Sequence, residues 1–220
     1  MSARENGRRN GGGDARGVPA RPPRRKDSQQ DAAEARLKIV PVTPRYWPAL
    51  EALFGPERGA DGGCWCLWWR LSRSTWYAMT KSGRKAEMKR LIETGPPPGV
   101  IALEDSTAVG WCAVAPHERY PTLERSPVAH PIDDPKSWCI SCFYIAASHR
   151  RRGIMAPLIR GAVQYAIARG ASTIDAFPQD MTGRKGAIDK FVGVASVFKR
   201  CGFHTVERRS EFRIAMRYQA

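Results

Sequence analysis

ISCFYIAASHRRRGIMAPL, residues 140–158, joins an apolar run with strand character to a basic turn, reaches Gly153 and continues as an amphipathic helix. The helix carries two rows of apolar residues spaced four apart: Ile154, Leu158, Ala162 and Ala166, and Met155, Ile159, Val163 and Ile167. Such spacing places all of them on one broad face. It predicts a helix over residues 153–169 that packs on a sheet and ends at Gly170.

The turn before this helix has the features of a phosphate-binding loop. The first N–H groups of a helix have no partner within the helix, and the helix dipole favours an anion at that end. Arg150, Arg151 and Arg152 stand directly before Gly153. A basic run can also be only a solvated surface. A strand before it and a long helix after it favour a pyrophosphate site instead.

This arrangement resembles the acyl-CoA loop of the GNAT acyltransferase superfamily, where Arg/Gln-x-x-Gly-x-Gly/Ala follows a strand and opens a helix. Arg150, Gly153 and Met155 stand at the three defined positions. A second resemblance lies in VASVFKRCGFHTV (194–206), which is similar to the closing helix and strand of the superfamily. CWCLWWR (64–70) is similar to a segment of a bacterial subgroup. Together the resemblance covers roughly residues 36–218.

The resemblance implies a GNAT fold of the α/β class, with a central mixed, mostly antiparallel sheet, two splayed parallel strands and flanking helices. It also implies acetyl-CoA as the acyl donor, with the thioester held by the backbone of residues 143–145. The cofactor-binding residues that it implies are Phe143, Tyr144, Ile145, Arg150, Arg151, Arg152, Gly153, Ile154 and Met155.

The first 35 residues have the composition of a disordered segment. They are rich in Gly, Arg, Pro, Asn and Gln and show no apolar periodicity. They contain no apolar leader core, and no run in the chain approaches the roughly 20 apolar residues of a membrane span. We therefore expect a basic tail over residues 1–35, one domain over residues 36–220 and a cytoplasmic location.

The chain is strongly basic, with 36 Lys and Arg against 21 Asp and Glu and a net charge of +15. An acidic cofactor accounts for part of this charge. RNA or a ribosome is another possible partner, although the arginines are scattered and form no nucleic-acid motif.

Six cysteines include a C-x-C at Cys64 and Cys66 and a C-x-x-C at Cys139 and Cys142. Residues three apart in a strand point to opposite faces. Cys139 and Cys142 are therefore not expected to share a metal ion, and we expect no metal site. We interpret the cysteines as small, reduced, buried residues.

The remaining segments alternate between strand and helix patterns. We expect strands over 37–42, 99–104, 108–115, 137–146 and 172–177, and helices over 46–54 and 74–94. Trp65, Trp68, Trp69 and Trp76 lie around the start of the second helix. Burial in the core is their usual role, and an aromatic wall for the acceptor is the alternative.

The candidate catalytic residues are loop carboxylates and one tyrosine. Glu118 follows the predicted strand 108–115, and Asp133 and Asp134 precede the strand 137–146, so each is a candidate base. Ordinary solvated carboxylates are the alternative. The resemblance implies a tyrosine acid in the closing helix, but that position holds Phe198. Tyr144, another group or water then donates the proton, or the thiolate leaves unprotonated.

We therefore expect an N-acetyltransferase that moves an acetyl group from acetyl-CoA to a primary amine of an unidentified acceptor, as a monomer or homodimer. Met155 and Phe198 depart from the superfamily pattern and support one alternative, a CoA-binding module without turnover. The charge supports another, a basic RNA- or ribosome-associated protein.

Overall fold

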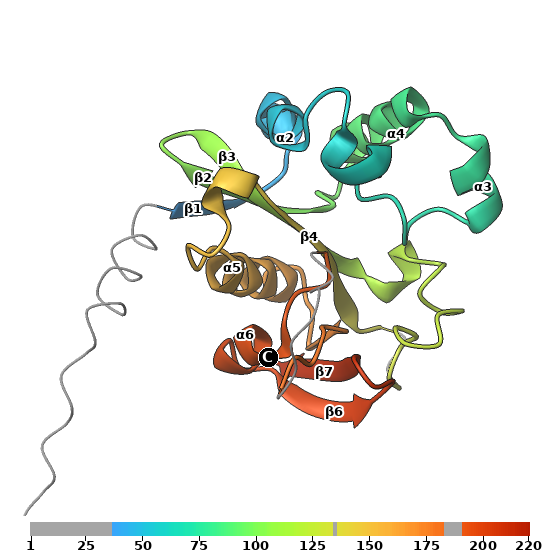
Figure 1. Cartoon of the computed structure of the whole chain (residues 1–220), viewed down its shortest axis with the longest axis vertical. Coiled ribbons are helices and arrows are strands. Elements are labelled where there is room, and N and C mark those ends of the chain that lie inside the picture. Colours follow the sequence, from blue (N-terminus) through green and yellow to red (C-terminus); the bar gives the residue numbers. More distant parts are fainter. Residues whose placement is uncertain (1–36, 134–135, 183–190) are drawn as a thin grey trace, which may run out of the picture.

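The computed structural model describes residues 37–133, 136–182 and 191–220, so the predicted tail over residues 1–35 lies outside the described residues. The described strands form a seven-stranded sheet in the order β1-β2-β3-β4-β5-β7-β6 (Figure 1). Their bounds are β1 Leu37–Pro41, β2 Gly99–Glu104, β3 Thr107–Pro116, β4 Trp138–Ile145, β5 Thr173–Ala176, β6 His204–Arg208 and β7 Ile214–Gln219.

The sheet is mixed, and most of its pairs are antiparallel. Strands β1 to β4 pair consecutively and antiparallel. β4 and β5 pair in parallel over residues 138–140 and 174–176. β7 then pairs antiparallel with both β5 and β6. This confirms the predicted fold class, including the parallel pair joined by the helix after the arginine turn.

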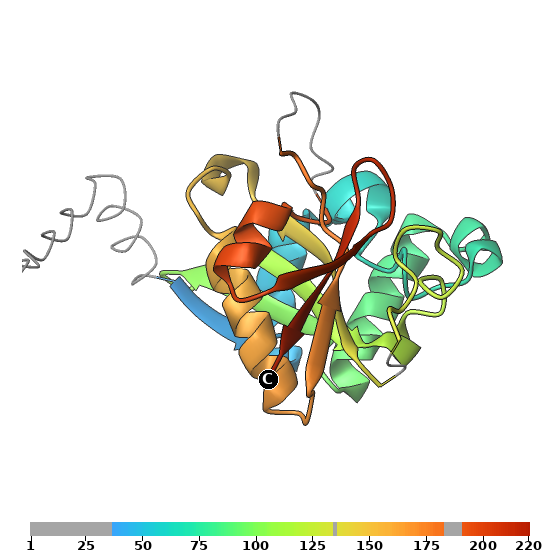
Figure 2. The ribbon, with the colours of Figure 1, turned by 90° about the horizontal axis from the view of Figure 1, so that it is seen from below.

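Helices cover both faces of the sheet (Figures 1 and 2). Helices α2 (Trp47–Phe54) and α4 (Lys81–Thr94) lie on one face, and α5 (Met155–Ile167) and α6 (Ala195–Arg200) lie on the other. Figure 2 shows α5 crossing the strands obliquely. Its contacts with β1, β2, β3 and β4 hold the turn before it against the end of β4.

The apolar face predicted for α5 is the face that packs. Leu158, Ile159, Ala162 and Ala166 are fully buried in the core between α5 and the sheet. Ile167, at the end of the second apolar row, is 39% exposed. Gly170 follows with φ +88°, a left-handed conformation that glycine adopts without steric cost. The helix therefore forms as the sequence predicts, but it begins at Met155, two residues later than expected.

The single helix expected over residues 74–94 is wrong, because the chain forms two helices there. Helix α3 (Arg73–Ala78) ends at Met79, which is extended, and α4 begins after Thr80. The Thr80 hydroxyl accepts a hydrogen bond from the Gly83 N–H at 3.0 Å. A threonine that caps a new helix start competes with continuation of the first helix.

A β-bulge in β4 overturns the expectation that Cys139 and Cys142 face opposite sides. Ala113 pairs with Cys142 and Val114 with Ile140, so Ser141 is an extra residue in β4. Cys139 lies opposite Ala115, on the same face as Cys142. Nevertheless, no group of three or more His, Cys, Asp or Glu side chains in the described chain is placed to hold a metal ion. No helix within the described ranges is long and apolar enough to cross a membrane.

Candidate active site

The parallel strands β4 and β5 separate beyond residues 140 and 176, and residues 191–194 enter the gap between them. On one side the Phe143 N–H donates to the Phe191 carbonyl at 2.7 Å. On the other side the Gln179 N–H donates to the Gly193 carbonyl at 3.0 Å. The gap is therefore bounded by the end of β4, by the start of α5 and by this segment.

A cavity of about 340 Å³ opens beside this gap, and we call it the loop cavity. It brings together every cofactor-binding residue predicted from the sequence except Arg152. Val194 and Val197 complete its apolar side. The lining is apolar toward β4 and α6 and basic at Arg150 and Arg151.

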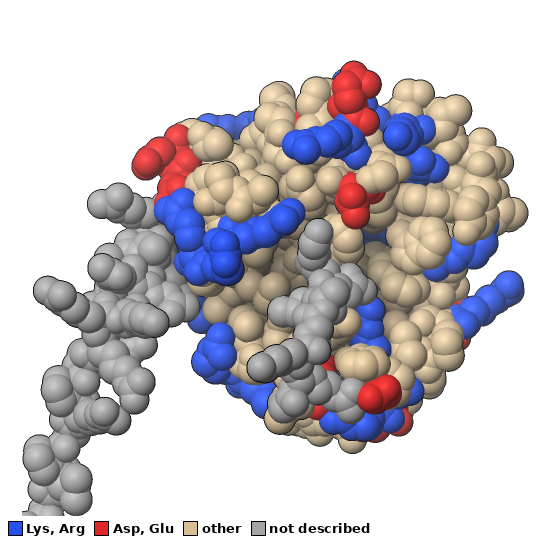
Figure 3. Space-filling model, viewed as in Figure 1, with Lys and Arg blue, Asp and Glu red and all other residues tan. Residues whose placement is uncertain are grey.

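The arginine turn has a defined conformation. Arg151 and Gly153 both have positive φ, +62° and +81°. The Arg150 Nε–H donates to the Ile145 carbonyl at 3.1 Å, which ties the turn to the end of β4. Basic side chains gather over this loop on the molecular surface (Figure 3). No side chain caps the N-terminus of α5. The Ala156 N–H donates to the Gly153 carbonyl at 3.3 Å and Pro157 has no N–H, so the Met155 N–H is the donor that the first turn leaves for an anion.

Arg152 turns away from the loop cavity and binds Glu104 at the end of β2. Its Nη2 lies 2.9 Å from Glu104 Oε1, and His149 Nε2 lies 3.1 Å from Glu104 Oε2. This corrects the expectation that Arg152 joins the other two arginines. The carboxylate anchors both ends of the turn. Nothing in the sequence identified Glu104, which lies 48 residues before Arg152.

The backbone of β4 is only partly open to a ligand. The Phe143 N–H is already bonded to Phe191, which corrects the expectation that all of residues 143–145 are free to hold a thioester. N–H groups two residues apart in a strand point the same way, so the Ile145 N–H also points toward the gap. A thioester carbonyl that used the Phe143 N–H would have to replace the Phe191 carbonyl.

The two departures from the superfamily pattern do not obstruct the loop cavity. Met155 lines it, with its sulfur toward Gly193, where an added Cβ would lie 3.4 Å from the Sδ. Phe198 is fully buried, with ring centroids 5.9 Å from Phe143 and 5.0 Å from Phe203. It does not line the cavity. A hydroxyl at that position would therefore enter the core.

Of the candidate catalytic residues, Tyr144 alone is placed at this cavity. Glu118 is 73% exposed and lies beside Arg119. It follows Pro116, which pairs with Trp138 at the opposite end of β4. The expectation that Glu118 faces the pocket is wrong, because the end of β3 meets the start of antiparallel β4. Asp134 lies outside the described residues.

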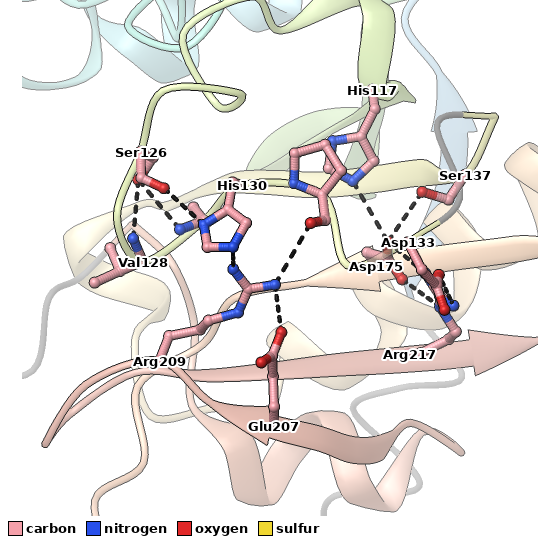
Figure 4. Close-up of polar contacts among 12 residues, drawn as sticks. His117, Ser126, Val128, His130, Asp133, Ser137, Asp175, Glu207, Arg209 and Arg217 are labelled. Carbon is pink, nitrogen blue, oxygen red and sulfur yellow. Dashed lines mark hydrogen bonds and ion pairs between the residues drawn. The ribbon is translucent and has the colours of Figure 1, made fainter.

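Asp133 belongs to a polar network at the paired ends of β4 and β5 (Figure 4). Its Oδ1 accepts from Arg217 Nη1 at 2.6 Å. Arg217 also binds both oxygens of the fully buried Asp175, at 2.7 and 3.0 Å. The Ser137 hydroxyl donates to Asp175 at 2.9 Å, and His117 Nε2 lies 3.5 Å away. The network joins β5 to β7 and to the residues that flank β3 and β4.

The residues around Asp175 determine the pKa of its carboxyl group. Burial raises the pKa of the Asp175 carboxyl, but the nearby His117 imidazole, the hydrogen bonds from Arg217 and Ser137 and the charge of Arg217 outweigh it. The net result is a pKa below the ordinary carboxyl value. Asp175 is thus ionised, and its role is to hold the strand ends together.

A second cavity lies on the opposite face of β4. It has a volume of about 260 Å³ and is lined by the thiols of Cys64, Cys66 and Cys142 and by Trp68 and Trp69. We call it the thiol cavity. Asp61, Phe191 and Val192 also line it. The sequence singled out neither Asp61 nor Phe191.

The tryptophan cluster divides between core and cavity. Trp65 is 1% exposed and packs against Trp47 and Phe54, so it belongs to the core. Trp68 and Trp69 line the thiol cavity. Trp76 lies edge-on to Trp68, with ring centroids 5.1 Å apart. Burial in the core therefore holds for Trp65, whereas Trp68 and Trp69 line a cavity.

Comparisons with known proteins support the fold assignment. The model of the acetyltransferase (GNAT) family matches residues 65–203, more than half of the chain. No curated protein matches the sequence. An N-acetyltransferase from Staphylococcus aureus Mu50 is similar in structure, with 14% identity, coverage of 84% of this chain and 97% of that chain, and a TM-score of 0.46.

Two further solved structures are similar to about the same degree. A ribosomal-protein-alanine N-acetyltransferase from Brucella melitensis has 16% identity, covers 83% of this chain and 99% of its own, and gives a TM-score of 0.49. A PaiA N-acetyltransferase from Thermoplasma acidophilum in complex with coenzyme A has 12% identity, coverage of 84% and 99%, and a TM-score of 0.46.

Proposed function

The chain belongs to the acetyltransferase (GNAT) family, and from this premise we propose that it transfers an acetyl group from acetyl-CoA to a primary amine. One observation carries the proposal. The uncapped N-terminus of α5 and the side chains of Arg150 and Arg151 border an apolar cavity that ends at β4. A pyrophosphate suits the turn, and the neutral pantetheine arm suits the apolar part.

In this proposal, different residues bind the pyrophosphate and position the thioester. Arg150 and Arg151 bind the pyrophosphate together with the Met155 N–H at the start of α5. Gly153 allows the backbone to approach the phosphates. Residues 143–145 line the path of the thioester, and the Ile145 N–H is the donor in β4 that points to its carbonyl oxygen.

In the transfer step the nitrogen of a neutral amine attacks the acetyl carbonyl carbon. A C–N bond forms, the C–S bond breaks, the nitrogen loses one proton to water, and CoA leaves as a thiolate that takes up a proton. We propose Tyr144 as the donor of that last proton, because Tyr144 is among the residues that line the loop cavity. Glu118 and Asp133 have no part in this scheme.

The test is calorimetric titration with acetyl-CoA. Wild type should bind with micromolar affinity. Arg150→Ala should weaken binding about tenfold or more, since a hydrogen bond to a charged group contributes about 1.5–3 kcal/mol. Gly153→Glu should abolish binding by placing a carboxylate at the phosphates. Arg169→Ala, an exposed arginine beyond the far end of α5, is the matched control and should leave binding unchanged.

Absence of binding by folded wild-type protein would overturn the proposal. Equal loss of affinity in Arg150→Ala and Arg169→Ala would show that only overall charge matters. Binding without acetyl transfer to any amine would instead support a CoA-binding module. The hydrogen bond between Phe143 and Phe191 favours that second candidate, because it occupies one donor of β4.

A further inference from the structure

The thiol cavity is placed to receive the acceptor of the proposed reaction. Cys142 lines the thiol cavity and the next residue, Phe143, lines the loop cavity, so the two cavities meet β4 from opposite faces. Phe191 lines both. An acceptor in the thiol cavity can therefore reach an acetyl group in the loop cavity beside Phe191, at the gap between β4 and β5.

Two of the thiols that line the thiol cavity are protonated near neutral pH. Burial raises the pKa of the Cys64 thiol to about 11. The hydrogen bond with Cys142, together with burial, raises the pKa of the Cys66 thiol well above its usual value. The Cys66 and Cys142 sulfurs lie 3.5 Å apart. The protonated thiols of Cys64 and Cys66 behave as small apolar groups, and with Trp68 and Trp69 they form an apolar part of the cavity.

The size of the cavity limits the acceptor. A dry apolar cavity of about 150 Å³ accommodates benzene. The thiol cavity, at about 260 Å³, has room for one such ring with a short chain. A polyamine or a sugar amine would bury further polar groups without partners, at about 1–3 kcal/mol for each.

The thiol cavity carries one carboxylate and one guanidinium among its lining residues, and the carboxylate suits a cationic end on the acceptor. Asp61 lines the thiol cavity and also an adjoining polar hollow that reaches Tyr144 and Arg150. It stands in the turn Gly59–Gly63. Two backbone hydrogen bonds hold this turn: the Cys64 N–H donates to the Asp61 carbonyl and the Trp65 N–H donates to the Gly59 carbonyl, both at 3.0 Å. Arg213, the cation on the same wall, donates to the Phe177 carbonyl at 2.8 Å.

We propose that the acceptor is a small arylalkyl primary amine, with its ring against Trp68 and Trp69 in the thiol cavity and its amino group between Asp61 and Phe191. This inference rests on the proposed acetyl transfer and names its substrate class. Asp61 is a binding residue here, because its carboxylate attracts the ammonium form and orients the nitrogen toward the gap.

The experiment compares three amines with the full-length protein and saturating acetyl-CoA. They are 2-phenylethylamine, spermidine and an octapeptide with a free N-terminus. Mass spectrometry detects the acetylated product, since the six cysteines of the chain would react with a thiol reagent. We expect kcat/KM for 2-phenylethylamine to exceed the other two at least about tenfold, a difference of about 1.4 kcal/mol.

Two variants locate the acceptor. Asp61→Asn should raise KM for 2-phenylethylamine about tenfold, the effect of losing one charge-assisted hydrogen bond, with kcat nearly unchanged. Val192→Trp places an indole in the thiol cavity and should abolish turnover of this amine. Asp105→Asn, the same charge change in the exposed turn between β2 and β3, should alter neither parameter. All three should retain the wild-type Kd for acetyl-CoA.

The outcomes separate the two proposals. If acetyl-CoA binds but spermidine or the peptide is preferred, or no amine is acetylated, the substrate class is wrong while the donor site stands. If Val192→Trp acetylates 2-phenylethylamine as wild type does, the thiol cavity does not hold the acceptor. If folded wild type does not bind acetyl-CoA, both proposals fail together.

Discussion

Replacing Asp175 by asparagine tests the polar network that holds β4 and β5 together at one end. Asparagine keeps the shape of the side chain and removes its charge. It also turns an amide N–H₂ toward groups that donate hydrogen bonds to the carboxylate, namely Nε and Nη2 of Arg217 and the Ser137 hydroxyl. Arg217, which is 7% exposed, would keep only Asp133 as an ionic partner.

The expected loss of stability is large because the pair is buried. Removing one partner of a buried ion pair costs about 3–5 kcal/mol. Since Asp133 still neutralises part of the Arg217 charge, we expect about 3 kcal/mol for Asp175→Asn. For a domain of this size that corresponds to a fall in Tm of about 6–12 °C. Thermal and urea unfolding measure it, and Asp105→Asn in the exposed β2–β3 turn is the control.

The effect of Asp175→Asn on stability should also depend on pH. The pKa of Asp175 is lower in the folded protein than its ordinary value of about 3.9. Its ionic contribution is therefore complete above about pH 4 and is lost as the pH falls through the lower folded-state pKa. The difference in the free energy of unfolding between wild type and Asp175→Asn should shrink in that acid range. A Tm within 2 °C of wild type at pH 7, or a constant difference down to pH 2, would refute the reasoning.

Three further substitutions have defined outcomes. Phe198→Tyr places a hydroxyl in a fully buried site and should lower the free energy of unfolding by about 1–3 kcal/mol without raising kcat; an increased acetylation rate at unchanged Tm would contradict this. Glu118→Gln should change stability by less than about 0.5 kcal/mol and leave the acetylation rate within error, whereas a marked drop in kcat would restore Glu118 as a base. Gly161→Ala would put a Cβ 2.2 Å from Ile39 Cγ2 and should lower the free energy of unfolding, measured in urea, by about 1–3 kcal/mol. Adding Ile39→Ala should relieve this clash. Without the clash, alanine would instead stabilise the helix by about 1 kcal/mol.

The parts of the fold that the sequence predicted are those with a local cause. The period of α5, its glycine ends and the hairpin from β2 to β3 depend on neighbouring residues. The division of residues 73–94 into α3 and α4 depends on one hydrogen bond from Gly83 to Thr80, which apolar periodicity does not report. The bulge at Ser141 depends on pairing with β3, and no residue within β4 predicts it.

The candidate site divides in the same way. The arginine turn and the cofactor-binding residues are contiguous, and the structure places all of them except Arg152 around one cavity. Glu104 and Asp61 reach the site from segments far away in the sequence, so no local pattern selects them. The placement of Glu118 failed for a topological reason. A loop after an antiparallel strand lies beside the start of its partner, whereas the site lies at the end of β4.

The bulge and the network explain why this sheet can carry two cavities. Asp175 binds Arg217 of β7 and the Ser137 hydroxyl just before β4, so β4 and β5 can separate beyond residue 140 without loss of the pairing below it. The extra residue at Ser141 changes which side chains of β4 face each side of the sheet, at the point where β5 separates from β4. Cys142 and Phe143 then face the thiol cavity and the loop cavity from one short segment of backbone. A donor and an acceptor held on opposite faces can meet only where the sheet is open, and the polar network fixes that opening by keeping the other end closed.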